Sequence, residues 1–229
     1  VGSEMCIRDS MEADCFITDF LQRPFDLVKL KKAFTKWQTK MYGKGWNALY
    51  MENHDHPRII SRYGSEKYRV ESGKSIAASY LFQRGTPFVY QGQEIGMINT
   101  PLASLDDYKD IMVKNNARIA RSLGLSKETV LRLAQKASRD NARTCMQWSG
   151  APNAGFTNGK PWFVVNSNYK DINVESQLDD PNSILNFYRN ALQFRRDNPV
   201  VIYGDYVEHM PKSLSLIHIS EPTRLLSIS

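Results

Sequence analysis

The chain has 229 residues and no apolar run close to the roughly 18 residues that a helix needs to cross a bilayer. It has only three cysteines, Cys6, Cys15 and Cys145, and their spacing fits neither a metal site nor an even-numbered disulfide framework. The few cysteines therefore favour a reducing compartment and predict a cytoplasmic protein. Together these absences exclude a membrane-spanning protein and a small disulfide-stabilised domain.

A concentrated block of positive charge is also absent. The net charge is +6, but the 30 basic residues are interleaved with 24 acidic ones and form no stripe with aromatic residues. A nucleic-acid partner is therefore not predicted. No Asp-rich loop suggests calcium, and no motif suggests a cofactor. With 41% hydrophobic and 24% charged residues, the composition is that of a soluble globular chain.

The two ends do not continue the patterns of their neighbours. Residues 1–10 and 213–229 show no amphipathic periodicity and resemble translated sequencing-library adapter rather than protein. The alternative is that they are ordinary frayed termini. We leave both segments out of the fold prediction.

The first half of the remaining chain alternates between helical and strand patterns. Apolar residues at three-and-four spacing predict helices over 24–37 and 66–84. Short apolar runs at 46–51 (WNALYM) and 86–90 (TPFVY) predict buried strands, each followed by polar residues. The order helix, strand, helix, strand predicts α/β units with a parallel sheet.

The second half begins with a long mixed segment. Residues 92–166 contain helical patches at 105–120 and 127–137, and an insertion of this kind lies at the catalytic rim of an α/β barrel. A last amphipathic helix is predicted at 183–196, with turn and cap residues before it. The alternation in residues 200–207 predicts a strand of a following β domain.

The most informative segment is Asn53-His54-Asp55-His56-Pro57-Arg58, directly after the first predicted strand. Side chains at the carboxyl ends of parallel strands are rigidly held and exposed, and barrel active sites lie there. A carboxylate beside an imidazole and a guanidinium suits a site that orients hydroxyl groups and stabilises positive charge. On composition alone, a polar loop in which Asp55 pairs with Arg58 is the favoured explanation of the segment.

Three segments, in order, resemble the α-amylase superfamily, glycoside hydrolase family 13. Residues 53–58 resemble the motif at the seventh barrel strand, and 85–97 (GTPFVYQGQEIGM) the eighth strand with its loop. Residues 139–148 (RDNARTCMQW) resemble a distinctive loop of the oligo-1,6-glucosidase branch, which includes dextran glucosidases, trehalose-6-phosphate hydrolases and sucrose isomerases. The resemblance covers nearly everything from Phe25 to about Lys212.

The resemblance implies an α/β fold that is part of a TIM (β/α)8 barrel. Residues 11–198 would supply the last strands and helices of the barrel, and 199–212 the start of a C-terminal β domain. The family's nucleophile and general acid lie on the fourth and fifth strands, upstream of these segments. Because a retaining glycosidase needs both carboxyl groups, about 5 Å apart, the chain by itself is expected to hydrolyse nothing.

The resemblance also implies roles for individual residues. Asp55 would be the third essential carboxylate, which binds sugar hydroxyls and supports the transition state, and His54 would bind hydroxyls of the same glucose. Arg143 would close over the substrate near the cleaved bond. Arg58 would either contact sugar or hold Asp55 in place. Glu94 is expected to have a structural loop role, because the family's acid lies earlier in the chain.

Cys145 departs from the motif, which usually has proline at this position, and this leaves the conformation of the loop open. The implied function is retaining hydrolysis of terminal α-linked glucose from oligosaccharides, without a metal or other cofactor. Two alternatives stay open: a sucrose isomerase or transglucosidase, and a non-catalytic barrel such as the heavy subunit of an amino-acid transporter. The linkage specificity and the oligomeric state are not predicted.

Overall fold

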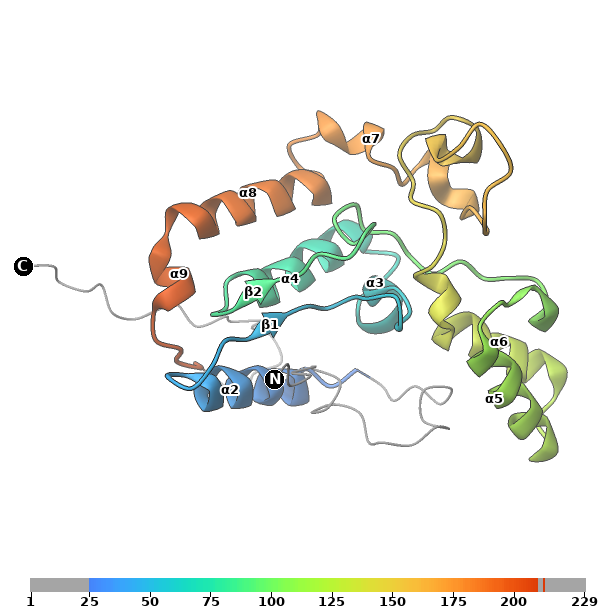
Figure 1. Cartoon of the computed structure of the whole chain (residues 1–229), viewed down its shortest axis with the longest axis horizontal. Coiled ribbons are helices and arrows are strands. Elements are labelled where there is room, and N and C mark those ends of the chain that lie inside the picture. The colour runs from blue at the N-terminus through green and yellow to red at the C-terminus, as the bar shows by residue number, and fades with distance from the viewer. Residues whose placement is uncertain (1–24, 210–211, 213–229) are drawn as a thin grey trace, which may run out of the picture.

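The computed structural model describes residues 25–209 and 212, and Figure 1 shows their arrangement. The tails predicted at 1–10 and 213–229 lie outside the described residues, as do Cys6 and Cys15. In the described part of the chain no helix is both long enough and apolar enough to pass through a membrane.

Two short parallel strands lie among the helices of the larger part of the molecule. β1 (Ala48–Leu49) pairs with β2 (Thr86–Pro87), with Ala48 opposite Thr86 and Leu49 opposite Pro87. The amides of Thr86 and Phe88 donate to the carbonyls of Asn47 and Leu49, at 2.8 Å each, so the missing N–H of Pro87 interrupts no bond of this pair. The predicted parallel pairing is confirmed, although each strand is shorter than its apolar run.

Helices predicted from the apolar periodicity surround this pair (Figure 1). They are α2 (Leu27–Met41), α4 (Arg69–Leu81) and α8 (Ile184–Asp197), and the short α3 (Ile59–Tyr63) precedes α4. The side chain of Asp26 caps α2 by accepting from the amide of Lys29 at 3.0 Å. α4 and α8 pack closely because Gly73 has no Cβ, which would lie 2.7 Å from Ile184 Cδ1.

The main core joins the strands to these helices. Its buried residues are Leu30, Phe34, Leu49, Met51, Ile59, Ile60, Ala77, Tyr80, Leu81, Ile184, Tyr188 and Ala191. β1 and α3 both contribute to it, so the segment that connects them is anchored at both ends. This anchoring fixes the position of residues 52–58.

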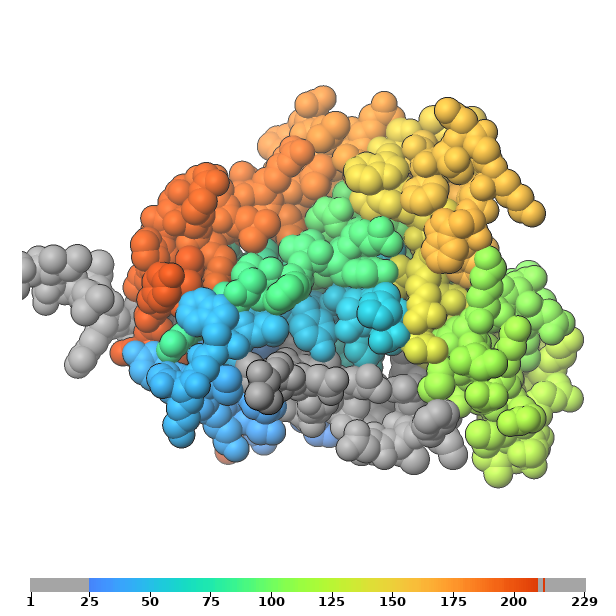
Figure 2. Space-filling view, viewed as in Figure 1, coloured from blue at the N-terminus to red at the C-terminus, as the bar shows by residue number. Residues whose placement is uncertain are grey.

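The predicted insertion forms a separate lobe at one end of the molecule (Figure 2). It contains the 3-10 turn η1 (Leu105–Asp107), α5 (Ile111–Ser122), α6 (Lys127–Ala137) and the 3-10 turn η2 (Arg139–Asn141). The patch predicted as one helix at 105–120 is divided, because Asp110 caps a new helix through the amide of Met112. A second buried cluster holds this lobe together: Leu102, Tyr108, Val113, Ala117, Val130, Ala134 and Phe163. The chain then returns through η3 (Pro152–Gly155), η4 (Ser167–Lys170) and α7 (Glu175–Leu178) to α8.

The strand predicted within 200–207 is wrong. Residues Pro199–Tyr203 form the helix α9, which packs against α8. Proline has the backbone φ of a first helical turn and leaves no helix bond unmade there, and the amide of Gly204 closes the turn on the carbonyl of Val200 at 2.8 Å. The apolar run that follows Pro199 therefore continues the helical layer. The domain boundary at 199 stays a prediction.

Candidate active site

The turn that carries Asp55 begins where β1 ends. Asn53 closes it locally, since its side chain accepts from the amide of Asp55 at 2.8 Å. Glu52 spans the whole segment, because its Oε1 accepts from the amide of Ile59, the first residue of α3, at 2.7 Å. The chain is therefore fixed on both sides of residues 53–58, and the Asp55 side chain projects from a rigid turn.

Of the two roles expected for Arg58, the structure contradicts contact with sugar. Its side chain is 0% exposed and forms a buried ion pair with Glu52, with Nη1 and Oε2 3.1 Å apart. Nη1 also donates to the carbonyl of Gln91 at 2.7 Å, and so links the loops that follow the two strands. Arg58 therefore neither faces sugar nor pairs with Asp55. Its side chain lies beneath the turn. It points inward because the segment 52–58 is anchored at both ends.

Asp55 lies instead beside two arginines of the insertion. Its Oδ1 is 3.0 Å from Nη2 of Arg143 and 3.3 Å from Nη1 of Arg139. The carboxylate is 40% exposed, so it remains open to a ligand. Asp55 and Arg143, which are 88 positions apart in sequence, thus come into contact.

His54 completes the exposed edge of this group. Its imidazole Nε2 is 3.4 Å from Oδ2 of Asp55 and its side chain is 67% exposed. The Nε of Arg143 donates to the carbonyl of His54 at 2.9 Å. His54, Asp55 and Arg143 thus present a carboxylate, an imidazole and a guanidinium on one surface, which is a set of groups that can bind neighbouring hydroxyls.

Arg139 is the residue of this group that the sequence prediction missed. It begins η2, four positions before Arg143, and a 3-10 turn followed by one more residue brings both guanidiniums to Asp55. Its other nitrogens bind Asp110. Hydrogen bonding to Asp110, together with the negative charge of that carboxylate, raises the pKa of Arg139, and burial of the guanidinium opposes this shift. In the sequence, the signal for this residue was a second arginine four positions before Arg143.

The loop after β2 supports the site from below. Gly92 has a φ of +86°, and a Cβ there would lie 2.3 Å from Met97 Sδ and 3.1 Å from Arg58 Nη1, so only glycine fits. Tyr90 donates its hydroxyl to the carbonyl of Ala142, just before Arg143, at 3.1 Å. Burial raises the pKa of Glu94, whose Oε2 has no hydrogen-bond partner within the described chain. The structural loop role expected for Glu94 stays a prediction.

Cys145 is a buried free thiol. Its amide donates to the carbonyl of Val164 at 3.2 Å, a bond that the proline usual at this position of the motif could not make. The loop thus keeps a defined conformation despite the substitution. Among the described residues, no group of histidine, cysteine and carboxylate side chains could hold a metal ion.

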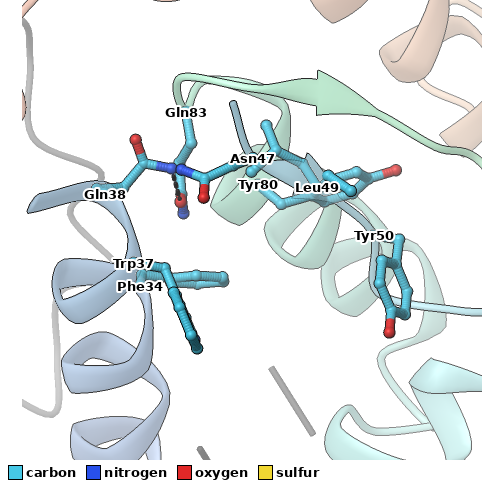
Figure 3. A pocket seen from close by; sticks show the side chains of 9 residues that line it. Phe34, Trp37, Gln38, Asn47, Leu49, Tyr50, Tyr80 and Gln83 are labelled. Atoms are coloured by element: carbon cyan, nitrogen blue, oxygen red, sulfur yellow. Dashed lines mark hydrogen bonds between the residues drawn. The ribbon is translucent and has the colours of Figure 1, made fainter. Parts of the chain in front are cut away.

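A separate pocket lies between α2, β1 and α4 (Figure 3). Its lining includes Phe34, Trp37 and Leu49 and the amides of Gln38, Asn47 and Gln83, of which Gln38 donates to Gln83 at 3.0 Å. It contains none of the predicted site residues. We therefore take the Asp55 group, and not this pocket, as the candidate active site.

Comparisons with known proteins show the family of the chain. The family described as "Alpha amylase, catalytic domain" matches residues 9–204. The chain is 47% identical over 186 residues to oligo-1,6-glucosidase of Parageobacillus thermoglucosidasius, covering 80% of this chain and 33% of that protein.

Two solved structures are similar over most of the chain. Trehalose-6-phosphate hydrolase of Bacillus licheniformis matches with a TM-score of 0.84 and 39% identity, covering 91% of this chain and 37% of that one. Isomaltulose synthase of Klebsiella sp. LX3 matches with a TM-score of 0.83 and 35% identity, covering 90% and 37%. The chain thus spans about a third of the length of the curated relatives that it matches. It belongs to the α-amylase catalytic-domain family.

Proposed function

We propose that the complete protein is a retaining α-glucosidase that removes terminal α-linked glucose from short oligosaccharides. β1 and β2 are the last two strands of its (β/α)8 barrel, and this chain contributes the part of the active site that those strands carry. The parallel pairing of β1 and β2 supports this, as does the similarity to oligo-1,6-glucosidases.

The observation that carries the proposal is the contact of Asp55 with Arg139 and Arg143 at the carboxyl end of β1. Both arginines bind the same oxygen, Oδ1, so the orientation of the carboxylate is set before any ligand arrives. Oδ2 lies beside the imidazole of His54 and is free of the arginines. In this role Oδ2 accepts hydrogen bonds from sugar hydroxyls, which strengthen as the sugar becomes an oxocarbenium-like ion.

The family resemblance gives the remaining roles, and both side chains are exposed enough to reach a ligand. His54 donates to a hydroxyl of the same glucose, and Arg143 lies over the bond that is cleaved, where it contacts the sugar next to that glucose. The reaction needs a nucleophile and an acid/base carboxyl about 5 Å apart. The family resemblance puts both on earlier strands of the complete barrel, so the present segment alone does not turn over substrate. The mechanism requires no cofactor, and the free thiol of Cys145 is consistent with a cytoplasmic enzyme.

A sucrose isomerase is the second candidate, because isomaltulose synthases are among the similar structures. It forms the same glucosyl-enzyme intermediate and differs in the acceptor. A non-catalytic barrel fits less well, since it has no use for a carboxylate oriented by two arginines and open to solvent.

The test uses the complete protein, assayed with isomaltose, maltose, sucrose and trehalose-6-phosphate. We expect glucose release from isomaltose, and a loss of turnover of at least about a hundredfold in Asp55→Asn, which keeps the shape of the side chain but not its charge. Asp179→Asn, at an exposed acid, is the matched control and should behave as wild type. The proposal is refuted if the wild-type protein turns over none of these sugars, or if the Asp55→Asn variant is active.

A further inference from the structure

The carboxylate of Asp110 lies behind the candidate site, on the side away from solvent. Its side chain is 1% exposed, and no motif in the sequence marks it. We propose that Asp110 is a positioning residue, which holds Arg139 so that Arg139 in turn orients Asp55. This inference rests on the proposed glycosidase function.

The geometry of Arg139 carries the first step. Asp110 binds it through two parallel bonds, from Nε to Oδ2 at 2.9 Å and from Nη2 to Oδ1 at 2.5 Å. A two-bond pairing of this kind fixes the plane of a guanidinium. The third nitrogen, Nη1, then points at Oδ1 of Asp55 from 3.3 Å. The direction of the Asp55 contact is therefore set by Asp110.

Asp110 is itself immobilised from two sides. It caps α5, a helix of 12 residues, since its Oδ1 accepts from the amide of Met112 at 2.9 Å. Asp140, the neighbour of Arg139, accepts through Oδ2 from the amides of Lys109 at 2.8 Å and Asp110 at 3.0 Å. The start of α5 and the turn η2 thus hold each other. Arg139 spans from this rigid junction to the Asp55 turn.

Arg143 differs from Arg139 in its anchoring. Its side chain donates to Asp55 and to the carbonyl of His54, both in the turn that faces the ligand. It can therefore move with a bound sugar, whereas Arg139 stays fixed on Asp110. Arg139 thus sets the orientation of Asp55, and Arg143 responds to the substrate.

Charge gives the second step. The negative charges of Asp55 and Asp110 face the positive charges of Arg139 and Arg143. Without the charge of Asp110, the buried part of Arg139 loses its partner and the guanidinium must find compensation elsewhere. Among the described residues, Asp55 is the other carboxylate to which Arg139 donates a hydrogen bond. Arg139 would then shift toward Asp55 and change the orientation that the sugar meets.

Asp110→Asn separates this role from the helix cap. Asparagine caps helices about as well as aspartate, so the bond from Met112 can be kept. Its NH2 group, however, would face a donor of Arg139, and the two-bond pairing would be lost. Asp26→Asn is the matched control, because Asp26 also caps a helix, α2, but pairs with the exposed Lys29.

Both variants are tested in the complete protein on its glucoside substrate, with kcat, KM and Tm measured. For Asp110→Asn we expect a fall in kcat of about tenfold or more, a KM within about threefold of wild type, and a Tm close to that of wild type. Asp110→Glu, which keeps the charge, should recover part of kcat. Asp26→Asn should leave kcat and KM unchanged.

Two results would overturn the inference and are distinct from failure of the proposed function. An Asp110→Asn variant with wild-type kcat, or one whose loss of activity follows only its loss of folded protein, would refute the positioning role while wild type still releases glucose. A wild-type protein that acts on no glucoside would instead remove the proposed function, and the inference with it.

Discussion

Replacing Arg58 by methionine should destabilise the turn that carries Asp55 more than any other single change near the site. The guanidinium is fully buried and pairs with Glu52, whose side chain is also 0% exposed. Burial raises the pKa of Glu52, and Arg58 is the main influence that lowers it. Arg58→Met removes that influence and leaves the carbonyl of Gln91 without the donor that Arg58 Nη1 supplies.

The magnitude follows from the burial of both partners. Removal of one member of a buried ion pair typically costs about 3–5 kcal/mol, whereas replacing both members by well-packed neutral residues is often close to neutral. We therefore expect about 3 kcal/mol or more for Arg58→Met, and a clearly smaller loss for the double variant Glu52→Gln/Arg58→Met. The loss of stability for Arg58→Lys should lie between these two values. Lysine keeps the charge but lacks the forked guanidinium that reaches both Glu52 and Gln91.

Hydrogen exchange in the complete protein measures this locally. The amide of Ile59 is bound to Glu52, so peptides that span residues 52–63 report the opening of the turn. A loss of 3 kcal/mol corresponds to exchange roughly a hundredfold faster. If exchange in these peptides is unchanged in Arg58→Met, or if the double variant is as unstable as the single one, the ion pair does not hold the turn.

Two further predictions concern the loop after β2. Gly92→Ala should destabilise the protein by about 1–3 kcal/mol in urea unfolding, because alanine must adopt a φ of +86° and its Cβ meets Met97; wild-type stability would contradict the packing described for this loop. Glu94→Gln should flatten the dependence of stability on pH. Burial raises the pKa of Glu94, so its stabilising contribution is complete below the unfolded-state value near 4.5 and is lost as the pH rises through the folded-state value. Urea unfolding of wild type and Glu94→Gln from pH 4 to 8 would therefore show a smaller decline in the variant, and an equal or larger decline would contradict this reasoning.

The helices and the parallel pairing were predicted from apolar periodicity. An element that buries one face needs apolar residues at regular positions along its sequence. α6 has the predicted bounds, 127–137, since a polar cap and an apolar stripe coincide there. Asp55 and Arg143 were named as site residues through the family resemblance, because no periodicity relates residues 88 positions apart. Local patterns thus predicted the elements, and only the motifs predicted which residues share the site.

The errors have physical reasons that the sequence did not show. Arg58 follows the strand like His54 and Asp55 do, and nothing local tells which polar side chain turns inward; Glu52, at the end of the strand, was its available partner. Residues 200–207 alternate like a strand, but Pro199 starts a helix that α8 supports. Arg139 was missed because its role depends on Asp110, a cap residue whose partner lies 29 positions away.

A crystal structure of the complete protein with glucose bound tests the central claim most directly. We predict a glucose whose hydroxyls lie within about 3 Å of Asp55 Oδ2 and His54 Nε2, with Arg139 still bound to Oδ1 of Asp55. A glucose bound at another surface, with the Asp55 carboxylate left facing solvent, would contradict it.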